Sequence, residues 1–398
     1  KITDSVKIIG ENAFYNTAYY NDESNWENNI LYLNTILLDA KDEALGEVII
    51  KDGTTSVSAN AFEYSDTLTS VTIPDSVTSI GDSAFTYCDN LVTVTIGSGV
   101  IDISNYIFYS CESLKEFIVS ENNPAYSSEN GLLLSKDKST LIKYPTAKED
   151  VIFTIPEYIS TIATNAIEQP MHLRLLVLGE NLVSFESGAI DIFGAVTLNQ
   201  NNVKSFIDSG CSALKVHFDG TEDDFADSYG VSFGEAIGEE FENGLYEISY
   251  GLPVLISENY EYNYIVTCDN EIEIINCKNK VGNVTVPAEI EGLSVTGIGV
   301  AAFANLELLS NYNIFSAENS LLKVNLPESV EHISSHAFAY NQYLRTVDFD
   351  DGVVSIGGGT FAYCYQLCVQ LPDSVKTVGS EAFYDCEYVG LGRNVESL

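Results

Sequence analysis

Hydrophobic and polar positions recur along this chain with a period of about 23 residues. In IPDSVTSIGDSAF (73–85), the aliphatic residues Ile73, Val77 and Ile80 are separated by polar residues, and the stretch ends in Ala-Phe. Copies of the pattern occupy 2–14, 50–62, 96–108, 155–167, 178–190, 326–338, 349–361 and 371–383, with a stretched copy over 286–303. A fixed period of this length predicts structural repeats, each of which buries its apolar side against its neighbours.

A second apolar pattern lies between the copies. It occurs as LTSVTI (68–73), LVTVTI (91–96), LKEFIV (114–119) and LRTVDF (344–349). Apolar and polar residues alternate here and many are β-branched, which predicts a short strand with one buried face. Because a single coil cannot bury that face alone, we expect the strands of successive coils to pair in a parallel ladder. The predicted fold is a repeat solenoid, mostly β, with short helices or turns.

The residue that ends most copies is aromatic, and we expect it to point into the core above its equivalent in the next coil. These core residues are Phe14, Phe62, Phe85, Phe108, Phe303, Phe338, Phe361 and Phe383, while isoleucine takes the position at 167 and 190. Burial of one such side chain stabilises a fold by roughly 1.5–3 kcal/mol. The stacked coils are therefore expected to supply most of the folding free energy.

Gaps between the copies indicate how the chain is divided. We predict a first repeat array over 1–232, with insertions at about 15–49 and 112–154. Residues 233–258 are acidic and lack the pattern, so we interpret them as a linker. Residues 259–286 alternate like strands, with turns at Asp269-Asn270 and Gly282-Asn283, and are expected to form a β cap that opens a second array over 259–398.

The charge of the chain excludes one class of partner. Asp and Glu number 58 and Lys and Arg number 18, which gives a formal net charge of −40. Nucleic-acid binding needs a basic surface, so no nucleic-acid partner is expected. There is no apolar run of the length that spans a bilayer, so we expect no direct membrane insertion in this segment. The sequence starts at Lys1 in the middle of the repeat pattern, so any signal and anchor are expected outside the segment.

Four cysteines share one position, three residues after the repeat aromatic. They are Cys88, Cys111, Cys364 and Cys386. We expect buried thiols at a coil corner, and disulfides between adjacent coils are the alternative. Cys268 and Cys277 are either free or bridge a hairpin. A catalytic thiol needs a base beside it, and the repeat supplies none, so no catalytic residue is predicted and the chain is not expected to be an enzyme.

Two further groups of residues are compared with metal sites. His332 and His336 have the spacing of two ligands on a helix, but the repeat pattern places them at solvent-facing positions of a coil. Acidic residues gather at Asp348, Asp350 and Asp351, and again over 219–227. Neither group has the spacing of a calcium loop, so we interpret both as solvated surface and predict no metal and no cofactor.

Tyrosines give the clearest candidates for ligand contact. Tyr64, Tyr87, Tyr340 and Tyr363 each follow the repeat Phe by two residues, so stacked coils align them in columns. Rows of tyrosine offer rigid contact area that suits protein or glycan binding, whereas packing of the coil edges is the alternative. Trp26, Tyr19 and Tyr20 in the first insertion are further candidates for ligand contact, and packing is again the alternative.

Residues 68–91 resemble the consensus LxxVxIPxxVxxIGxxAFxxCxxL of the BspA-like leucine-rich-repeat family of bacterial surface proteins. The insertions NTAYYNDESNWENNILYLNTILLDA (16–40) and NNPAYSSENGLLLSKDKSTLIKYP (122–145) are also similar to features of that family, as is LKVHFDGTEDDFADS (214–228). The resemblance implies a right-handed, leucine-rich-repeat-like solenoid at the cell surface or outside the cell. It also implies an adhesin-like, non-enzymatic module that binds a protein or glycan on a cell surface or matrix. A passive stalk that carries other domains is the alternative.

Overall fold

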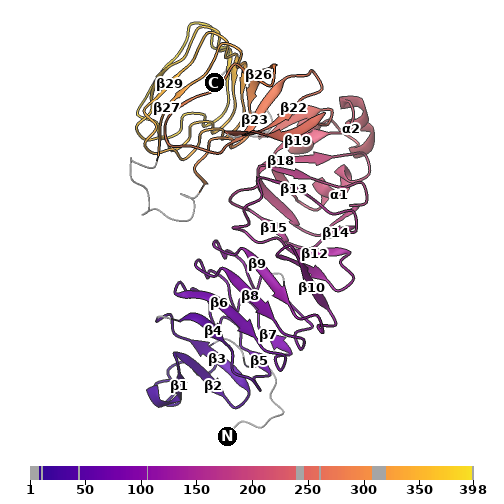
Figure 1. Cartoon of the computed structure of the whole chain (residues 1–398), viewed down its shortest axis with the longest axis vertical. Helices are drawn as coiled ribbons and strands as arrows, with labels where there is room; N and C mark the ends of the chain where they lie inside the picture. Colours follow the sequence, from indigo (N-terminus) through magenta and orange to yellow (C-terminus); the bar gives the residue numbers. More distant parts are fainter. Residues whose placement is uncertain are drawn as a thin grey trace.

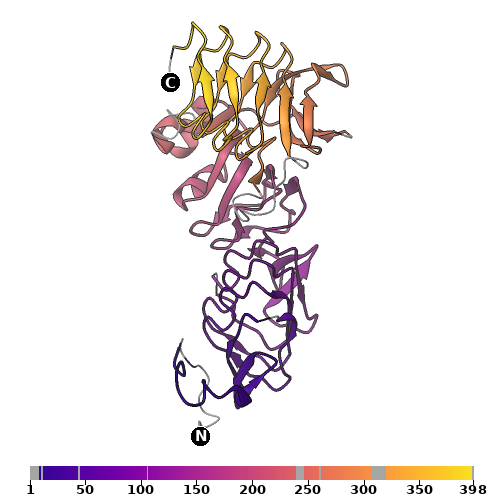
Figure 2. The ribbon, with the colours of Figure 1, turned by 90° about the vertical axis from the view of Figure 1, so that its left-hand side faces the viewer.

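Two stacks of coils make up the structure, which is a computed structural model (Figure 1). It describes residues 9, 12–43, 45–104, 106–238, 246–259, 261–306 and 320–396. Figure 1 shows the first array rising from the N-terminus, with the second array above it. In Figure 2, the coils of the second array lie side by side across the view, so the two arrays run in different directions. The predicted parallel solenoid is confirmed.

The first array is built on two parallel ladders, and each coil adds one strand to each ladder. The longer strands are β4 (Gly46–Ile49), β6 (Leu68–Ile73), β8 (Thr93–Ile96) and β9 (Glu116–Val119), and the shorter ones are β5 (Ser56–Val57) and β7 (Ser79–Ile80). Val94 pairs with Val71 on one side and with Phe117 on the other. Equivalent apolar residues of successive coils therefore lie on one buried face, as the alternation predicts.

Each insertion folds into antiparallel strands, the last of which pairs in parallel with a short strand of a coil. The first contains η1 (Glu23–Asn25), β1 (Trp26–Glu27), β2 (Ile30–Leu33) and β3 (Ile36–Ala40), and β3 pairs with β5. The second contains β10 (Tyr126–Glu129), β11 (Leu132–Ser135) and β12 (Thr140–Lys143). Asn123 holds the second insertion on the array, because its Nδ2 donates to the carbonyls of Gly97 and Val100, both at 2.8 Å.

The second half of the first array ends in a broad sheet covered by short helices. Its strands are β13 (Ile152–Thr154), β16 (Leu175–Val177), β18 (Ile190–Leu198), β19 (Ser212–Phe218) and β20 (Glu247–Tyr250), with β14 (Thr161–Ile162), β15 (Ile167–Glu168) and β17 (Ser184–Phe185) beside them. The helices are α1 (Val203–Asp208), α2 (Glu222–Tyr229) and α3 (Phe233–Ile237). Acidic residues at 222–224 form the first turn of α2, where the helix dipole favours negative charge.

The second array opens with an antiparallel cap and continues in parallel coils. One sheet contains β21 (Leu255–Glu258), β22 (Tyr262–Val266), β23 (Ile272–Cys277), β26 (Leu293–Ile298), β28 (His332–Ile333), β30 (Ser355–Ile356) and β32 (Thr377–Val378), with β25 (Glu289–Ile290) paired to β26. The other ladder contains β24 (Gly282–Thr285), β27 (Leu321–Asn325) and β29 (Thr346–Asp348), followed by β31 (Cys368–Gln370) and β33 (Tyr388–Gly390).

Two local expectations differ from the structure. Gly282 and Asn283 do not form a turn: they begin β24, which pairs with β27, so the ladder of the second array starts earlier than predicted. The segment 233–258, interpreted as a linker, contains α3, β20 and β21 in its described part. Its strands give no clear apolar pattern in the sequence, because each contains only four residues and at least half of these are acidic or carry a hydroxyl group.

Phenylalanine rings form the centre of both arrays. The rings of Phe62, Phe85 and Phe108 stack with centroids 5.0 and 5.6 Å apart. Phe303, Phe338, Phe361 and Phe383 stack in the same way in the second array. Phe383, in a late coil, is partly buried, whereas Phe14 is partly buried in a separate cluster with Trp26. Most of the first repeat copy, 2–14, lies outside the described residues.

Glycine at the coil corner allows neighbouring backbones to approach closely. A Cβ on Gly81 would lie 2.3 Å from the backbone nitrogen of Ala59 in the preceding coil. The positive φ of this corner falls instead on Ser83, at 56°. Gly81 is therefore required by the contact between coils and not by its backbone dihedrals.

The two arrays are packed against each other through a mixed apolar and polar interface. The apolar part joins the outer faces of two sheets and consists of Leu175, Ala195, Leu214, Ile265, Ile275 and Val300. Beside it, Lys215 Nζ lies 2.6 Å from a carboxylate oxygen of Glu273. The buried Arg174 donates from Nε to the carbonyl of Ala301 at 3.1 Å. Charged groups of the first array are therefore satisfied by the second.

Because two histidines are buried at this interface, we expect the folded chain to lose stability in mild acid. Burial, and after it the charge of Lys215, lowers the pKa of His217 to about 4, and burial lowers that of His336 to about 4. In the unfolded chain both imidazoles protonate near their model value of 6.5. The unfolded state then binds more protons, so the free energy of unfolding falls between pH 6.5 and 4, by roughly 3 kcal/mol per histidine at most.

Chemical denaturation across this pH range measures the effect. Carboxylates also titrate near the lower end of this pH range. We therefore compare the slope of the free energy of unfolding against pH between the native chain and the variants His217→Gln and His336→Gln. We expect a shallower slope in each variant. Equal slopes would show that neither imidazole is held neutral in the folded chain.

No helix in the described residues combines the length and the apolar character needed to cross a membrane.

Candidate recognition surface

The four tyrosines that follow the repeat Phe by two residues share an unusual backbone conformation. Tyr64, Tyr87, Tyr340 and Tyr363 have φ of 59°, 57°, 64° and 61°. The N–H of each donates to a carbonyl of the next coil, as from Tyr64 to Thr86 at 3.1 Å and from Tyr363 to Tyr384 at 2.8 Å. The stacking of coils therefore holds these residues in the left-handed region, which costs most side chains about 1 kcal/mol.

Other coils show that this corner does not require an aromatic residue. The equivalent positions hold Asn16, Ser110, Gln169 and Asp385, all with positive φ. Asparagine and aspartate tolerate the left-handed region better than tyrosine does. Since the backbone favours small polar residues here, the presence of tyrosine at four corners indicates a role for the ring itself.

The rings form one column in each array. In the first, Tyr64 and Tyr87 are stacked with centroids 4.8 Å apart and an interplanar angle of 2°, and Tyr109 meets Tyr87 edge-on at 5.7 Å. In the second, Tyr340 and Tyr363 are stacked at 5.1 Å, and Tyr384 meets Tyr363 edge-on at 5.3 Å. Both columns consist of two stacked rings followed by one perpendicular ring.

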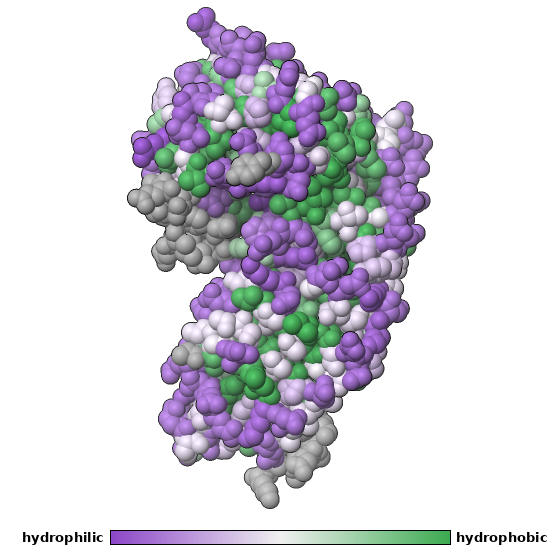
Figure 3. All heavy atoms as spheres, in the orientation of Figure 1, coloured by the Kyte–Doolittle hydropathy of each residue, from purple (hydrophilic) through white to green (hydrophobic). Residues whose placement is uncertain are grey.

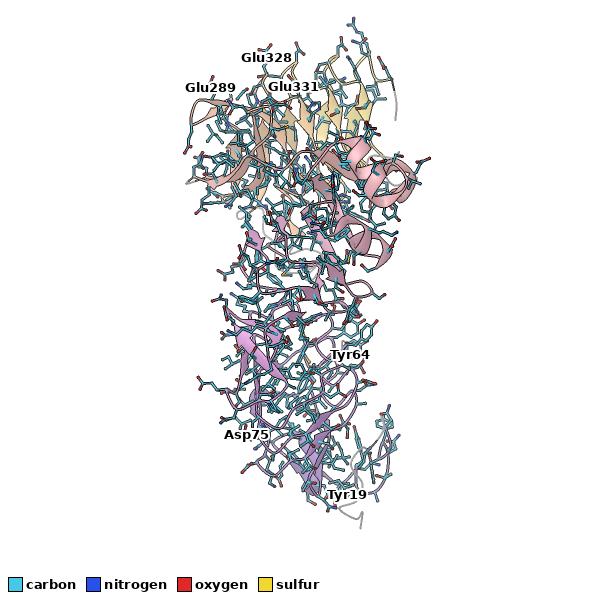
Figure 4. The ribbon with its side chains drawn as sticks, turned by 90° about the vertical axis from the view of Figure 1, so that its right-hand side faces the viewer. Tyr19, Tyr64, Asp75, Glu289, Glu328 and Glu331 are labelled. Atoms are coloured by element: carbon cyan, nitrogen blue, oxygen red, sulfur yellow. The ribbon has the colours of Figure 1, made fainter. Side chains whose placement is uncertain are left out.

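The outer parts of these columns are open to solvent. Tyr64 is 60% exposed and Tyr384 is 49% exposed, and Tyr106 beside the first column is 53% exposed. In Figure 4, Tyr64 and Asp75 lie at opposite sides of the first array, so the tyrosine column is separate from the corner that carries Asp75. We call the residues 64, 87, 106, 109, 340, 363 and 384 the tyrosine surface.

Ring geometry decides which groups the tyrosine surface offers. Tyr87 and Tyr363 each have a stacked ring on one side and a perpendicular ring on the other. Their π faces are therefore occupied, while their edges and hydroxyl groups remain available. Sugars pack their C–H groups on open aromatic faces, whereas protein surfaces also use the edge and hydroxyl of tyrosine.

Acidic residues surround both columns. The charge of Glu168, and after it burial, raises the pKa of Tyr109, with a smaller contribution from Asp191. These acids line a hollow of about 160 Å³ at the end of the first column, together with Tyr109 and with Leu306 of the second array. Glu381 and Asp385 lie near Tyr363 in the second column. Glu168 is itself paired with Lys143 at 3.0 Å, so the rim of negative charge on the tyrosine surface consists of Asp191, Glu381 and Asp385.

The aromatic residues of the first insertion are used inside the protein. The Trp26 indole N–H donates to the carbonyl of Tyr20 at 2.9 Å, and Lys41 Nζ lies 4.6 Å from the centroid of the Trp26 ring. The hydroxyl of Tyr20 donates to Asp39 at 2.9 Å and that of Tyr19 to the carbonyl of Tyr32 at 2.6 Å. These contacts place Trp26, Tyr19 and Tyr20 in the packing of the insertion, apart from the tyrosine surface, and their contact with a ligand stays a prediction.

The corner cysteines are free thiols with a common structural role. Cys88, Cys111, Cys364 and Cys386 each donate from Sγ to the carbonyl of a repeat phenylalanine one coil back, at 3.0–3.2 Å. Asn341 occupies the same position and donates to the carbonyl of Phe303 at 2.9 Å. Burial raises the pKa of Cys111 and Cys386 to about 12. These thiols are not activated nucleophiles, because nucleophilic attack requires the thiolate.

Cys268 and Cys277 are also free. Cys277 pairs with Tyr262 at one end of the β22–β23 hairpin, whereas Cys268 lies beyond Val266 at the other end. The strand register thus separates the two thiols by most of the length of the hairpin, and a bridge between them is sterically excluded.

The histidine pair does not share a face. His332 is exposed and its Nδ1 lies 2.8 Å from the Ser355 hydroxyl. His336 was expected at a solvent-facing position, but its ring packs on Phe193 of the first array at 5.9 Å, because the arrays contact each other there. Asp348 pairs with Lys323 at 2.5 Å. Among the described residues, no group of three or more potential ligands is placed to hold a metal ion.

The sequence pattern identified the two columns but missed two tyrosines that contact them. Tyr106 and Tyr365 contact Tyr109 and Tyr363 from neighbouring positions of the coil. Their spacing from the repeat Phe differs from that of the column residues. The frequency of tyrosine over 87–109 and 340–388 is the feature of the sequence that could have identified these two residues.

Comparison with known proteins gives one family and several structural relatives. The sequence profile described as "BspA type Leucine rich repeat region" matches six copies over residues 40–132 and 276–390, which is just over half of the chain. No curated protein matches. Among solved structures, the chain is similar to a leucine-rich cell surface protein from Faecalibacterium prausnitzii, with 16% identity, 93% and 91% of the two chains covered and a TM-score of 0.31.

Two other solved structures show a comparable likeness. A leucine-rich repeat protein from Eubacterium ventriosum is 17% identical, with 91% of this chain and 94% of the other covered and a TM-score of 0.32. The pneumococcal vaccine antigen PcpA is 16% identical, with 85% and 72% covered and a TM-score of 0.30.

Proposed function

Because this chain belongs to the family of BspA type leucine-rich repeat proteins, we propose that it is a non-enzymatic recognition module that acts outside the cell or at its surface. Its contact site is the tyrosine surface, and its ligand is a protein on a cell surface or matrix. The observation that carries the proposal is the set of four tyrosines held at corners where the backbone favours small polar residues. An adhesin-like role agrees with this surface.

The ring geometry favours a protein over a glycan as the ligand. The inner rings of both columns present edges and hydroxyls and keep their faces against other tyrosines. The acidic rim around Tyr109 and Tyr363 complements a ligand surface with lysine or arginine side chains. We therefore expect a protein ligand with a basic contact surface.

Binding tests on tyrosine variants measure the contribution of the columns. The chain is applied to a panel of purified matrix proteins and to a glycan array, at low and at physiological salt. In the variant, Tyr64, Tyr87, Tyr340 and Tyr363 are all replaced by Asn, which fits the left-handed corner. We expect the native chain to bind at least one protein and the variant to bind it at least tenfold more weakly.

The control changes the same corner in the coil of Tyr109, where the residue two positions after the repeat Phe is a serine. Ser110→Asn alters a residue with φ of 54° at the equivalent position and leaves all rings in place. Its binding should equal that of the native chain. Binding that survives the loss of all four rings, or that is confined to glycans, would contradict the proposed contact site. The absence of any ligand would favour the passive stalk.

A further inference from the structure

A groove of about 1090 Å³ lies between the end of the first array and one face of the second. One wall is β20, from Glu247 to Tyr250, and the floor includes Ser355 of β30 and Thr377 of β32. The volume of the groove is large enough for a peptide segment of several residues. None of the seven tyrosine-surface residues except Tyr384 lines it.

The strand β20 has one unpaired edge. It pairs only with β19, in parallel, and is the last strand of its sheet. Apart from their bonds to β19, the backbone groups of Glu247–Tyr250 form no hydrogen bond within the described chain. A strand with one neighbour directs alternate N–H and C=O groups to its open side, where an extended peptide can pair with them.

The sheet that contains β20 covers only part of the sheet below it. Lys215 on β19 contacts Glu273 on β23. In the next strand of the same sheet, β20, the carboxylate of Glu247 accepts hydrogen bonds from the backbone N–H and the hydroxyl of Ser335, at 2.7 and 3.0 Å. Ser335 lies just after β28. The next two strands of the lower sheet, β30 and β32, face the groove. A strand added to β20 would cover them and extend the two-layer packing.

The groove carries an excess of negative charge. Its acidic lining residues are Glu247, Asp269, Glu271, Glu273 and Glu381. The basic residues there are Lys215, which is paired with Glu273, and His332. Asp269 and Glu381 have no ion-pair partner in the part of the chain that the structure describes. A ligand in this groove is therefore favoured if its side chains are basic.

We propose that an extended basic peptide segment of a partner protein binds in this groove by adding a strand to the free edge of β20. The peptide backbone pairs with Glu247–Tyr250, and its lysine or arginine side chains reach Glu271 and Glu381. This site adjoins the second tyrosine column at Glu381 and Tyr384, but it does not depend on the proposed contact there, because strand pairing with β20 carries it and β20 contains no column residue.

A synthetic peptide tests both parts of the proposal. The probe is a capped decapeptide of alternating Lys and Thr, and its binding to the full chain is measured by calorimetry at about 50 mM salt. Two further decapeptides serve as comparisons: one has Glu in place of Lys, and the other has N-methyl groups on alternate residues, which removes the N–H groups needed for strand pairing. We expect both to bind at least tenfold more weakly, and the first peptide to slow amide exchange in residues 246–250.

Variants of the chain locate the charge contribution. Glu271→Gln combined with Glu381→Gln should weaken binding of the Lys-Thr peptide about three- to tenfold. Glu328→Gln is the matched control, because Glu328 is exposed on the same array and does not line the groove. It is labelled at the top of Figure 4. The chain with Tyr64, Tyr87, Tyr340 and Tyr363 changed to Asn should bind the peptide as the native chain does.

Four results would overturn the proposal. They are no binding at millimolar peptide, equal binding of the N-methylated peptide, equal effects of the groove variant and the Glu328 control, and amide protection that avoids β20. The tyrosine variant also separates the two sites: peptide binding that disappears with the column rings would place the peptide on the tyrosine surface instead.

Discussion

Replacing Phe85 by alanine is expected to lower the free energy of unfolding by about 3–5 kcal/mol. The Phe85 side chain is completely buried, and its ring lies between those of Phe62 and Phe108. Its removal leaves a cavity that rigid neighbouring coils cannot fill, and two ring contacts are lost at once. Thermal and chemical denaturation of the native and variant chains measure the change.

Ser79→Ala is the control for Phe85, because it changes the neighbouring strand β7 of the same coil at a residue that is only partly buried. Its effect should stay within about 0.5 kcal/mol. Since each coil contacts only its neighbours, the loss at Phe85 should appear as earlier unfolding of the first array. An unchanged melting curve for Phe85→Ala would contradict the stacked core.

Replacing Lys215 by methionine should destabilise the chain by a similar amount, about 3–5 kcal/mol. Lys215 and Glu273 are both buried where the two arrays meet, and their charged groups are 2.6 Å apart. Without the lysine, the carboxylate of Glu273 stays buried without its partner, and the contact between the arrays weakens. Chemical denaturation at neutral pH measures this loss.

The double variant Lys215→Met with Glu273→Leu separates the ion pair from the interface itself. An apolar pair of similar volume removes the unpaired charge, so we expect most of the lost stability to return. If the double variant is as unstable as Lys215→Met alone, the penalty does not come from the isolated carboxylate. If Lys215→Met has no effect, the ion pair does not hold the arrays together.

Repeat periodicity predicts the interior of each array well, because the same contact recurs in every coil. The positions of Val77, Ile80 and Phe85 follow from one short stretch of sequence, and all three are buried. The packing of the two arrays has no such periodic signal. Arg174 and Ala301 are 127 residues apart and make a single hydrogen bond. His336 occupies a polar slot of the repeat, and only the presence of the other array explains why its ring is largely covered.

The tyrosine surface was partly predictable for a related reason. Column positions follow from spacing, so Tyr64, Tyr87, Tyr340 and Tyr363 could be identified from the sequence. Their left-handed backbone could not, because the coil corner acquires this conformation from hydrogen bonds to the next coil. The free edge of β20 was also hidden, since it depends on where the sheet of the first array ends.

Stability and binding measured together on the variant with Asn at positions 64, 87, 340 and 363 test the proposed function most directly. Loss of ring stacking and relief of left-handed strain are each worth about 1 kcal/mol and oppose each other. If the columns are a contact surface, unfolding free energy should change by less than about 0.5 kcal/mol for each tyrosine replaced, while ligand binding falls at least tenfold. A chain that loses several kcal/mol of stability and keeps its binding would show that the columns serve only to pack the coil edges.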